Sequence, residues 1–331
     1  MKTIGITGAG SWGTALATVL AGKGHRVRIW DIDERHLRSM EEHRENVDYL
    51  PGVPLDDNIE ITYTTEAALK DADVVLFSAP AQHFREALTS ALEYIGNAAI
   101  VINVAKGIEQ KSLKRMSEIA AEHLDLDRYV VLSGPSHAEE VGRRLPTTVA
   151  AASYDLKAAE AVQDLFMTDR FRVYTTEDVV GVELGGALKN IIALGAGISD
   201  GMGFGDNAKA ALMTRGLAEI TRLGIKLGAR PETFAGLTGT GDLIVTCTSM
   251  HSRNRRCGIM IGEGMSPEEA TKKVGMVVEG MFTTEAAYEL ARRENVEMTI
   301  TEAIYRAIKG EITAAEAVGL LMGRTRKHEQ G

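Results

Sequence analysis

The sequence predicts an α/β fold, with a doubly wound parallel sheet in the N-terminal part and an all-α C-terminal domain. Short β-rich runs alternate with longer amphipathic stretches over about the first 180 residues, a pattern typical of a parallel sheet covered by helices. Beyond this point β-branched runs become rare, and Gly, Ala, Leu and Met recur at helical spacing. We therefore divide the 331 residues into a sheet domain, 1–180, and a helical domain, 181–331, that meet at a cleft.

The expected strands are short, and the apolar residues between them lie three and four positions apart, as in amphipathic helices. Each connection is expected to be a right-handed crossover. Six strands are expected at 3–7, 26–30, 59–63, 74–78, 100–104 and 130–132, and two more that could extend the sheet at 147–151 and 171–174. The clearest helices are expected at 14–21, 81–94 and 112–123.

The helical domain contains one segment, 184–199, of unusually small and apolar side chains. Gly185, Gly186, Gly195 and Gly197 would let other backbones approach it closely, so we expect a buried central helix. Only the tail, 324–331, is expected to fray.

Composition and charge exclude several classes of protein. The formal net charge of −9 argues against a general nucleic-acid binder, which needs a positive surface for phosphates. Cys247 and Cys257 are the only cysteines, and their spacing fits neither a zinc site nor a disulfide framework. The chain starts at Met1 without a signal segment, and no uninterrupted apolar run reaches about 18 residues. We expect a soluble cytoplasmic protein without a metal site.

A glycine-rich turn follows the first expected strand and opens the first expected helix. Gly8, Gly10 and Gly13 have the spacing GxGxxG. In this context Gly8 permits a tight turn, Gly10 lets the backbone approach a pyrophosphate, and Gly13 lets the helix pack on the strand. The free N–H groups and positive dipole end of the helix favour phosphate. Methyltransferases carry related loops, but the strand–turn–helix context indicates a Rossmann-type site for NAD or NADP.

Asp31 ends the second expected strand, where a carboxylate commonly accepts hydrogen bonds from the adenosine ribose. This favours NADH over NADPH. Two alternatives stay open: Asp31 could cap the following helix, and Arg28, Arg35 and His36 could accommodate a 2′-phosphate.

Lys189 is the only charged residue between Glu183 and Asp200, within the apolar segment. A buried ammonium should have a lowered pKa and could exchange a proton at neutral pH. The alternative is a structural lysine that extends to the surface or pairs with a buried acid, and Asn190 has the same two interpretations.

Four further segments offer polar groups to a substrate. Asp242, in a Gly-rich loop, could orient Lys189 or a substrate hydroxyl, or could cap a helix. Ser252, Arg253 and Asn254 offer a hydroxyl, a guanidinium and an amide suited to a phosphate, although a basic run is more often a solvated face.

Lys106 ends an expected strand at the carboxyl edge of the sheet, where open α/β folds bind ligands. The turn that contains Gly134 and Ser136 follows the next strand to the same edge. His137 is a less suitable base than Lys189, because a histidine at a helix start is usually ordinary.

In order and spacing, these motifs resemble the bacterial NAD(P)-dependent glycerol-3-phosphate dehydrogenase family over almost the whole chain. One departure lies after Trp30, where many family members have small or basic residues but this chain has Asp31-Ile32-Asp33. The resemblance is carried by residues 8–15, 106–107, 133–136, 181–205, 239–243, 246–248, 252–256 and 277–280.

The resemblance implies reversible reduction of dihydroxyacetone phosphate to sn-glycerol 3-phosphate by hydride transfer, which supplies glycerophospholipid synthesis. It implies Lys189 as proton donor and acceptor, no metal, and a homodimer. Substrate contacts are implied for Lys106, Gly134, Ser136, Asp242, Ser252, Arg253 and Asn254, and cofactor contacts for Ser11, Trp12, Lys106, Ala138, Arg253, Val277 and Glu279.

Three other functions compete with this one. A β-hydroxyacid or 6-phosphogluconate type dehydrogenase would share the nucleotide domain and a catalytic lysine, but Asp242 and the run 252–254 favour the first choice. A non-catalytic NAD-sensing regulator would leave Lys189 without a role. A DNA-binding role is disfavoured by the net charge.

Overall fold

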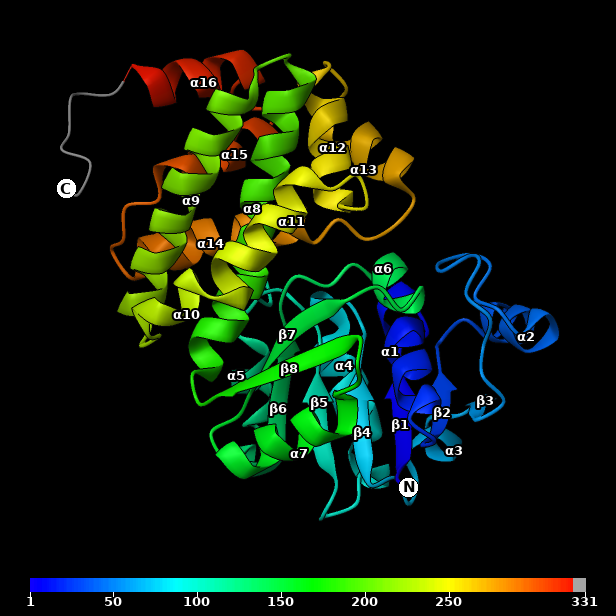
Figure 1. Cartoon of the computed structure of the whole chain (residues 1–331). Helices are drawn as coiled ribbons and strands as arrows, with labels where there is room; N and C mark the ends of the chain where they lie inside the picture. Colours follow the sequence, from blue (N-terminus) through cyan, green and yellow to red (C-terminus); the bar gives the residue numbers. More distant parts are fainter. Residues whose placement is uncertain (324–331) are drawn as a thin grey trace.

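The computed structural model describes residues 1–323, so the tail expected to fray, 324–331, lies outside the described residues. A sheet flanked by helices forms one half of the molecule, and a bundle of helices forms the other (Figure 1). The two halves are connected after β8 (Phe171–Thr176), where α8 (Val179–Gly201) begins.

The sheet has eight strands in the order β3-β2-β1-β4-β5-β6-β7-β8. The first six have the order of a doubly wound dinucleotide-binding fold, which confirms the predicted fold class. The other seven strands are β1 (Thr3–Thr7), β2 (Arg26–Trp30), β3 (Ile59–Ile61), β4 (Val74–Phe77), β5 (Ile100–Asn103), β6 (Tyr129–Ser133) and β7 (Thr147–Ala152).

One connection differs from the predicted crossovers. β7 pairs antiparallel with β6, whereas every other pair of neighbouring strands is parallel. The only helix between them, α6 (Ala138–Gly142), has five residues. Five helical residues span about 7.5 Å, less than half of the roughly 16 Å of a five-residue strand. The chain therefore turns back at the carboxyl end of β6 without crossing over the sheet.

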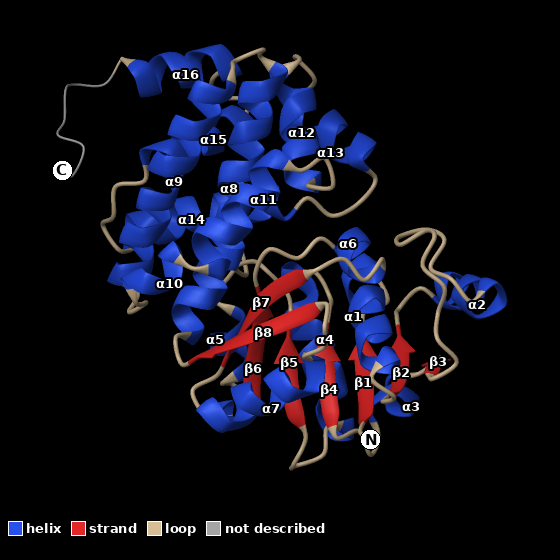
Figure 2. Ribbon diagram, viewed as in Figure 1, coloured by secondary structure: helices blue, strands red, loops and turns tan. Residues whose placement is uncertain are grey.

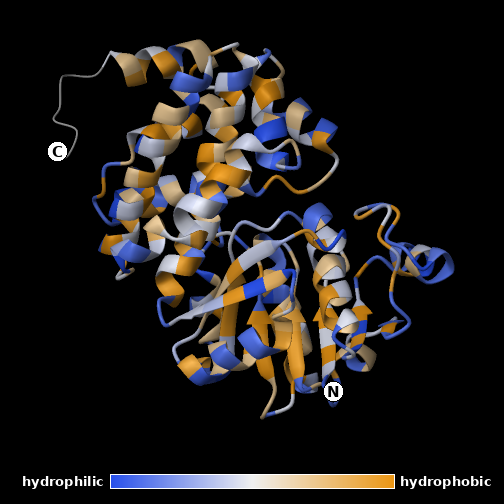
Figure 3. Cartoon of the chain, viewed as in Figure 1, coloured by the Kyte–Doolittle hydropathy of each residue, from blue (hydrophilic) through white to orange (hydrophobic). Residues whose placement is uncertain are grey.

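Helices cover both faces of the sheet (Figure 2). Apolar side chains of α1 (Ser11–Gly22), α6 and α7 (Leu156–Phe166) form one core layer with the strands. Those of α3 (Thr65–Leu69), α4 (Phe84–Ala91) and α5 (Met116–Ala120) form the other, and the strands between the two layers are strongly hydrophobic (Figure 3). The remaining helices here are α2 (Glu34–His43), η1 (Ala81–His83), η2 (Leu92–Tyr94) and η3 (Leu126–Arg128).

The helix expected at 112–123 is mostly absent. Only α5 forms there, because Leu113 has a positive φ of 57° and the Glu109 N–H bonds back to the Lys114 carbonyl. The helix expected at 14–21 is present as α1, and the one at 81–94 is divided into η1, α4 and η2.

α8 is the central helix of the second half and confirms the expected buried segment. Almost all of its residues are buried, and α9, α11, α12 and α14 pack around it. A Cβ on Gly197 would lie 2.1 Å from the Arg255 carbonyl oxygen, so only glycine permits this close contact with α12. Although α8 is long and apolar enough to cross a membrane, 94% of its most hydrophobic window is buried inside the protein. α8 is a core helix.

The other helices of this half complete the bundle. They are α9 (Asp206–Lys226), α10 (Pro231–Ala235), η4 (Leu237–Gly241), α11 (Asp242–Thr248), α12 (Arg253–Gly262), α13 (Pro267–Val274), α14 (Glu279–Arg293), α15 (Thr299–Ile308) and α16 (Ala314–Met322).

Candidate active site

Lys189 lies in the middle of α8 and is only 6% exposed. Its Nζ donates to Asp242 Oδ1 at 2.5 Å and to Thr246 Oγ1 at 2.7 Å. The second Asp242 oxygen, Oδ2, accepts from Lys106 Nζ at 2.8 Å. Lys189 therefore does not extend to the surface; it pairs with a buried acid that it shares with a second lysine. We call Lys106, Lys189, Asp242 and Thr246 the lysine cluster.

The charges of the lysine cluster affect one another's pKa values. Burial, with a smaller contribution from the Lys106 ammonium, lowers the pKa of Lys189 to about 8, although Asp242 opposes this shift. Burial alone would raise the pKa of Asp242, but the ammonium groups of Lys106 and Lys189 outweigh it and lower that pKa. At neutral pH the Asp242 carboxylate is ionised. The pKa of Lys189 lies close enough to neutral pH for its ammonium to lose and regain a proton.

Three elements bring the lysine cluster together. Lys106 follows β5 at the carboxyl edge of the sheet, and Lys189 comes from α8. Asp242 is the first residue of α11, and its carboxylate bonds to the two lysines instead of capping the helix. Thr246 lies one turn later and donates to the Asp242 carbonyl oxygen at 2.6 Å. Thr246 was not among the predicted site residues, although its four-residue spacing from Asp242 places both on one helix face.

The turn after β6 contacts the lysine cluster directly. The Gly134 carbonyl oxygen accepts from Lys106 Nζ and from Ser136 Oγ, both at 2.9 Å. Gly134 has a φ of +145°, and a Cβ there would lie 3.0 Å from Val149 Cα, so a larger residue would displace this turn. His137 Nε2 is 3.5 Å from the Val245 carbonyl oxygen, and burial together with the nearby Lys189 lowers the pKa of His137.

The run 252–254 is not a solvated basic face, because Ser252 and Asn254 are buried. Ser252 caps α12 by accepting from the Arg255 N–H. Asn254 donates to Asn190 Oδ1 at 2.9 Å and accepts from the Gly280 N–H at 2.8 Å. Asn190 in turn donates to the Lys106 carbonyl oxygen at 3.4 Å, so these amides connect α12, α8 and the end of β5.

Arg253 connects the helical half to the glycine-rich loop. Its Nη2 donates to Ser11 Oγ, in the first turn of α1, at 2.7 Å. Burial lowers the pKa of Arg253, but an arginine remains charged at neutral pH. A guanidinium from the start of α12 therefore lies beside the loop predicted to bind phosphate.

The glycine-rich loop has the geometry that a dinucleotide requires. Gly8 has a φ of +97°, and a Cβ on Gly13 would lie 2.0 Å from the Gly8 carbonyl oxygen. A Cβ on Gly10 would meet no atom within 4 Å, so the space above Gly10 is open. α1 starts without a side-chain cap, and the buried Trp12 Nε1 has no hydrogen-bond partner in the described part of the chain. These donors and this space fit a pyrophosphate and its ribose.

Asp31 is fixed beside this loop. Its Oδ2 accepts from the Ala9 N–H at 2.7 Å, and its Oδ1 accepts from the Asp33 N–H at 3.1 Å. The side chain that caps α2 is Asp33, which accepts from the Arg35 N–H. The alternative that Asp31 caps the next helix is therefore wrong.

All three nearby basic residues have partners, and they differ in how exposed they are. Arg28 donates to the carbonyl oxygens of Ala67 and Lys70, and His36 contacts the Ala9 carbonyl oxygen through Nε2 at 3.0 Å. The Arg35 side chain is 93% exposed and lies 3.6 Å from an Asp33 oxygen. Of the three, only Arg35 is placed to move toward a 2′-phosphate.

The remaining predicted cofactor residues start helices or precede them. Ala138 is the first residue of α6, and Val277 lies two residues before α14 and is partly exposed. Glu279, the first residue of α14, accepts from the Ala81 N–H at 3.0 Å through Oε1, while its buried Oε2 has no partner in the described residues. Burial raises the pKa of Glu279 to about 7.

Residues 1–323 contain no group of three or more His, Cys, Asp or Glu side chains that could hold a metal ion. Both cysteines are free and buried.

Comparison with known proteins identifies the family. The family models for the N-terminus and the C-terminus of NAD-dependent glycerol-3-phosphate dehydrogenase match residues 3–159 and 178–319. The chain is 58% identical to a glycerol-3-phosphate dehydrogenase (NAD(P)+) of Pelotomaculum thermopropionicum over 98% of this chain and 94% of that protein. It is 55% identical to one of Bacillus velezensis, over 99% and 96%.

A crystal structure of glycerol-3-phosphate dehydrogenase from Coxiella burnetii superposes with a TM-score of 0.94 at 38% identity, covering 98% of this chain and 99% of that one. D-mandelate dehydrogenase, at 13% identity and a TM-score of 0.66, shares the fold alone. The resemblance inferred from the motifs is confirmed: the chain belongs to the NAD-dependent glycerol-3-phosphate dehydrogenase family, whose members are oxidoreductases.

Proposed function

We propose that this chain catalyses the reversible reduction of dihydroxyacetone phosphate to sn-glycerol 3-phosphate, as a cytoplasmic homodimer that supplies glycerophospholipid synthesis. We place its domain boundary between residues 180 and 181. The observation that carries the proposal is the buried lysine cluster at the carboxyl edge of the sheet, together with the hydrogen bond from Arg253 to the start of α1 at the glycine-rich loop. The names of its relatives support the same reaction.

The residues around the glycine-rich loop would hold the cofactor, which supplies the hydride when bound. Gly8, Gly10, Gly13, Ser11 and Trp12 would contact the pyrophosphate side. Lys106, Ala138, Arg253, Val277 and Glu279 would line the nicotinamide side.

Lys189 would move the proton. An ammonium has three N–H donors, and two of those on Lys189 are used by Asp242 and Thr246. The third would protonate the substrate oxygen as that oxygen becomes an alkoxide. Asp242 would position Lys189 by holding it against Lys106, and a pKa of about 8 suits proton exchange in both directions.

The charge of the site fits a phosphate ester. Lys106, Lys189 and Arg253 contribute three positive charges and Asp242 one negative charge; Glu279, whose pKa is raised to about 7, is partly ionised at neutral pH, so the net charge lies between +1 (3 − 2) and +2 (3 − 1). A phosphate monoester carries about −1.5 to −2 charges at neutral pH. Arg253 and the start of α12, with Ser252 and Asn254, would hold the phosphate, while Gly134 and Ser136 would contact the rest of the substrate.

Asp31 would favour NADH. Its carboxylate retains lone pairs that could accept from the ribose hydroxyls, and a 2′-phosphate would be repelled by the negative charges of Asp31 and Asp33. Arg28 and His36 have other partners, and the exposed Arg35 is paired with Asp33, so a 2′-phosphate would compete with Asp33 for the Arg35 guanidinium.

The proposal is tested by following oxidation of NADH and NADPH with dihydroxyacetone phosphate and, as a control, unphosphorylated dihydroxyacetone. We expect turnover that requires the phosphate and is faster with NADH. Equal turnover of the two ketones would contradict a phosphate-binding site. Turnover only with β-hydroxyacids or 6-phosphogluconate would favour the competing dehydrogenase classes.

A further inference from the structure

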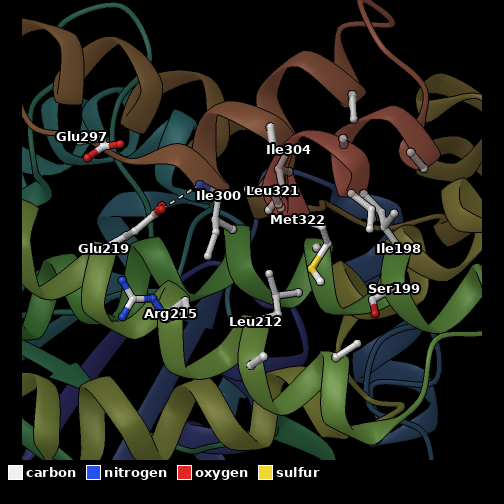
Figure 4. A pocket seen from close by; sticks show the side chains of 18 of the residues that line it. Ile198, Ser199, Leu212, Arg215, Glu219, Glu297, Ile300, Ile304, Leu321 and Met322 are labelled. Carbon is white, nitrogen blue, oxygen red and sulfur yellow. Dashed lines mark hydrogen bonds between the residues drawn. The ribbon is translucent and has the colours of Figure 1, made fainter. Parts of the chain in front are cut away.

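A groove of about 1030 Å³ lies in the helical half between α9 on one side and α15 and α16 on the other (Figure 4). Its lining shares no residue with the lysine cluster or the glycine-rich loop. The lining runs along α9 from Ala208 to Lys226, 18 positions or about 27 Å at 1.5 Å per helical residue. The groove is therefore long as well as large.

One end of the groove is apolar. On α9, Ala208, Ala211 and Leu212 face it at helical spacing. The opposite wall and the floor consist mostly of small and aliphatic side chains, and Ile304, Leu321 and Met322 lie across the groove from Leu212 in Figure 4. The members of this wall and floor are Gly195, Ile198, Ala303, Ile304, Ala307, Ala317, Val318, Leu321 and Met322.

The other end of the groove is charged. Arg215, Arg222 and Lys226 line it from α9, together with Glu219 and Glu297, so the net charge is +1 (3 − 2). Glu219 is 4% exposed, and its carboxylate accepts from the Ile300 N–H at 2.8 Å, at the start of α15. Its negative charge is thus directed at a helix N-terminus. Arg222 Nη2 donates to the Glu297 carbonyl oxygen at 3.0 Å, and the other N–H groups of its guanidinium are the donors that it could offer to a ligand, beside the Lys226 ammonium.

We propose that this groove binds a single-chain amphiphile with one anionic head group. The unbranched tail would lie along the apolar end, and a carboxylate or phosphate head would bind beside Arg222 and Lys226. The length, the volume and the change from apolar to cationic lining all match this class of ligand. A flat face of a second copy would fit less well, because the α15 wall is recessed and its Ile300 and Ile304 are buried.

The tail is tested by titration calorimetry with saturated carboxylates from octanoate to tetradecanoate, below their micelle-forming concentrations. We expect affinity to rise by up to about fourfold for each added methylene, since each buries apolar surface. Affinity that does not depend on chain length would overturn the proposal.

A matched pair of variants locates the site. Ala211→Trp would fill the apolar end, whereas Ala210→Trp places the same side chain on the neighbouring exposed position of α9, outside the lining. We expect about a tenfold or greater loss of dodecanoate affinity in Ala211→Trp alone. Equal affinities of the two variants would show that dodecanoate binds elsewhere, which also overturns the proposal. Dihydroxyacetone phosphate turnover reports folding of both variants.

The head group is tested by charge. Dodecanoate and dodecyl phosphate should bind, whereas dodecyltrimethylammonium should not. The tighter of the two anionic ligands identifies the preferred head group. The double variant Arg222→Gln/Lys226→Gln should lose about tenfold in affinity, whereas Lys272→Gln/Lys273→Gln, which removes two exposed charges from α13, should not. Equal binding of the cationic amphiphile would overturn the assignment.

Sedimentation tests the alternative that a second copy of this chain occupies the groove. If Ala211→Trp dissociates a dimer that Ala210→Trp retains, and no amphiphile binds to either the wild-type protein or Ala210→Trp, the groove is a subunit contact and the proposal fails. Because the groove shares no lining residue with the lysine cluster and the readout is binding, such a failure leaves the proposed dehydrogenase activity unaffected.

Discussion

Two buried charged residues of α8, Glu183 and Lys189, lie six positions apart and are used differently. Glu183 accepts from Arg115 Nη1, from the Ser117 N–H, both at 2.7 Å, and from Ser117 Oγ at 2.5 Å. Lys189 shares a single carboxylate with Lys106 and retains a donor for another partner. Glu183 is surrounded by matched donors and fixes α8 to α5, whereas Lys189 is left incompletely satisfied. A buried charge with spare hydrogen-bonding capacity indicates chemistry, and a saturated one indicates structure.

The largest expected effect is the loss of turnover when Lys189 is replaced. Lys189→Met should lower kcat by about 10²- to 10⁴-fold, because it removes the proton donor. It should change the free energy of unfolding little, since Asp242 keeps its bonds to Lys106 and Thr246. Steady-state kinetics and urea unfolding measure the two quantities, with NADH affinity as the control. Near-normal turnover would remove Lys189 from the reaction.

Glu183→Ala should show the opposite pattern. It removes the buried carboxylate that Arg115 contacts at 2.7 Å and leaves the guanidinium only the exposed Glu118 carboxylate at 3.4 Å; breaking a buried ion pair typically costs about 3–5 kcal/mol of unfolding free energy. Turnover per folded molecule should change little, because Glu183 contacts none of the lysine cluster. Glu183→Gln keeps an acceptor for the Ser117 N–H and should be less destabilised. A stable Glu183→Ala protein without turnover would contradict the distinction between the two sites.

The sequence predicted Lys189 but not the pairing of Glu183. A lone charged residue in an apolar segment can be recognised from the sequence alone. Asp242 and Lys106 could be predicted because Asp242 lies in a Gly-rich loop and Lys106 follows a predicted strand. The partner of Glu183, Arg115, lies 68 positions away in a stretch that was expected to be regular helix. Such contacts depend on how the halves of the molecule pack, which local periodicity does not encode.

The fold class followed from the alternation of strand and helix patterns. Two features could not be predicted in this way, because they depend on how the chain runs between elements in three dimensions. The direction of β7 is set by the short α6 connection, and strand propensity is the same in either direction. The groove beside α9 requires the relative placement of α9, α15 and α16, which have ordinary amphipathic sequences.

A smaller effect should appear in the pH dependence of the reaction. Reduction needs the protonated Lys189, so kcat/KM for the ketone should fall by about tenfold per pH unit above about pH 8. The rate of alcohol oxidation, which needs the neutral amine, should rise toward that pH.

The same group affects stability. The pKa of Lys189 in the folded state, about 8, is below the ordinary value of 10.5. Between these two pH values the unfolded state binds more protons, so the free energy of unfolding rises with pH.

Asp242→Asn provides the control for this assignment. Removing the carboxylate removes the charge that favours the Lys189 ammonium, so the break in the pH–rate profile should move to lower pH. An unchanged break would assign the titration to another group.

The smallest expected effect concerns Asp31. The hydrogen-bonding capacity of its carboxylate is used to an extent intermediate between those of Glu183 and Lys189. Like Glu183 it accepts hydrogen bonds on both carboxylate oxygens, but like Lys189 it is left with capacity for one more partner, and it is only partly buried. Asp31→Asn should lower the ratio of kcat/KM for NADH to that for NADPH by about tenfold, because it removes a negative charge beside the ribose. Asp33→Asn is the matched control: asparagine also caps helices, so α2 should persist and the ratio should change less. If Asp33→Asn changed the ratio as much as Asp31→Asn, the general negative potential of this loop, and not the position of Asp31, would determine the cofactor preference.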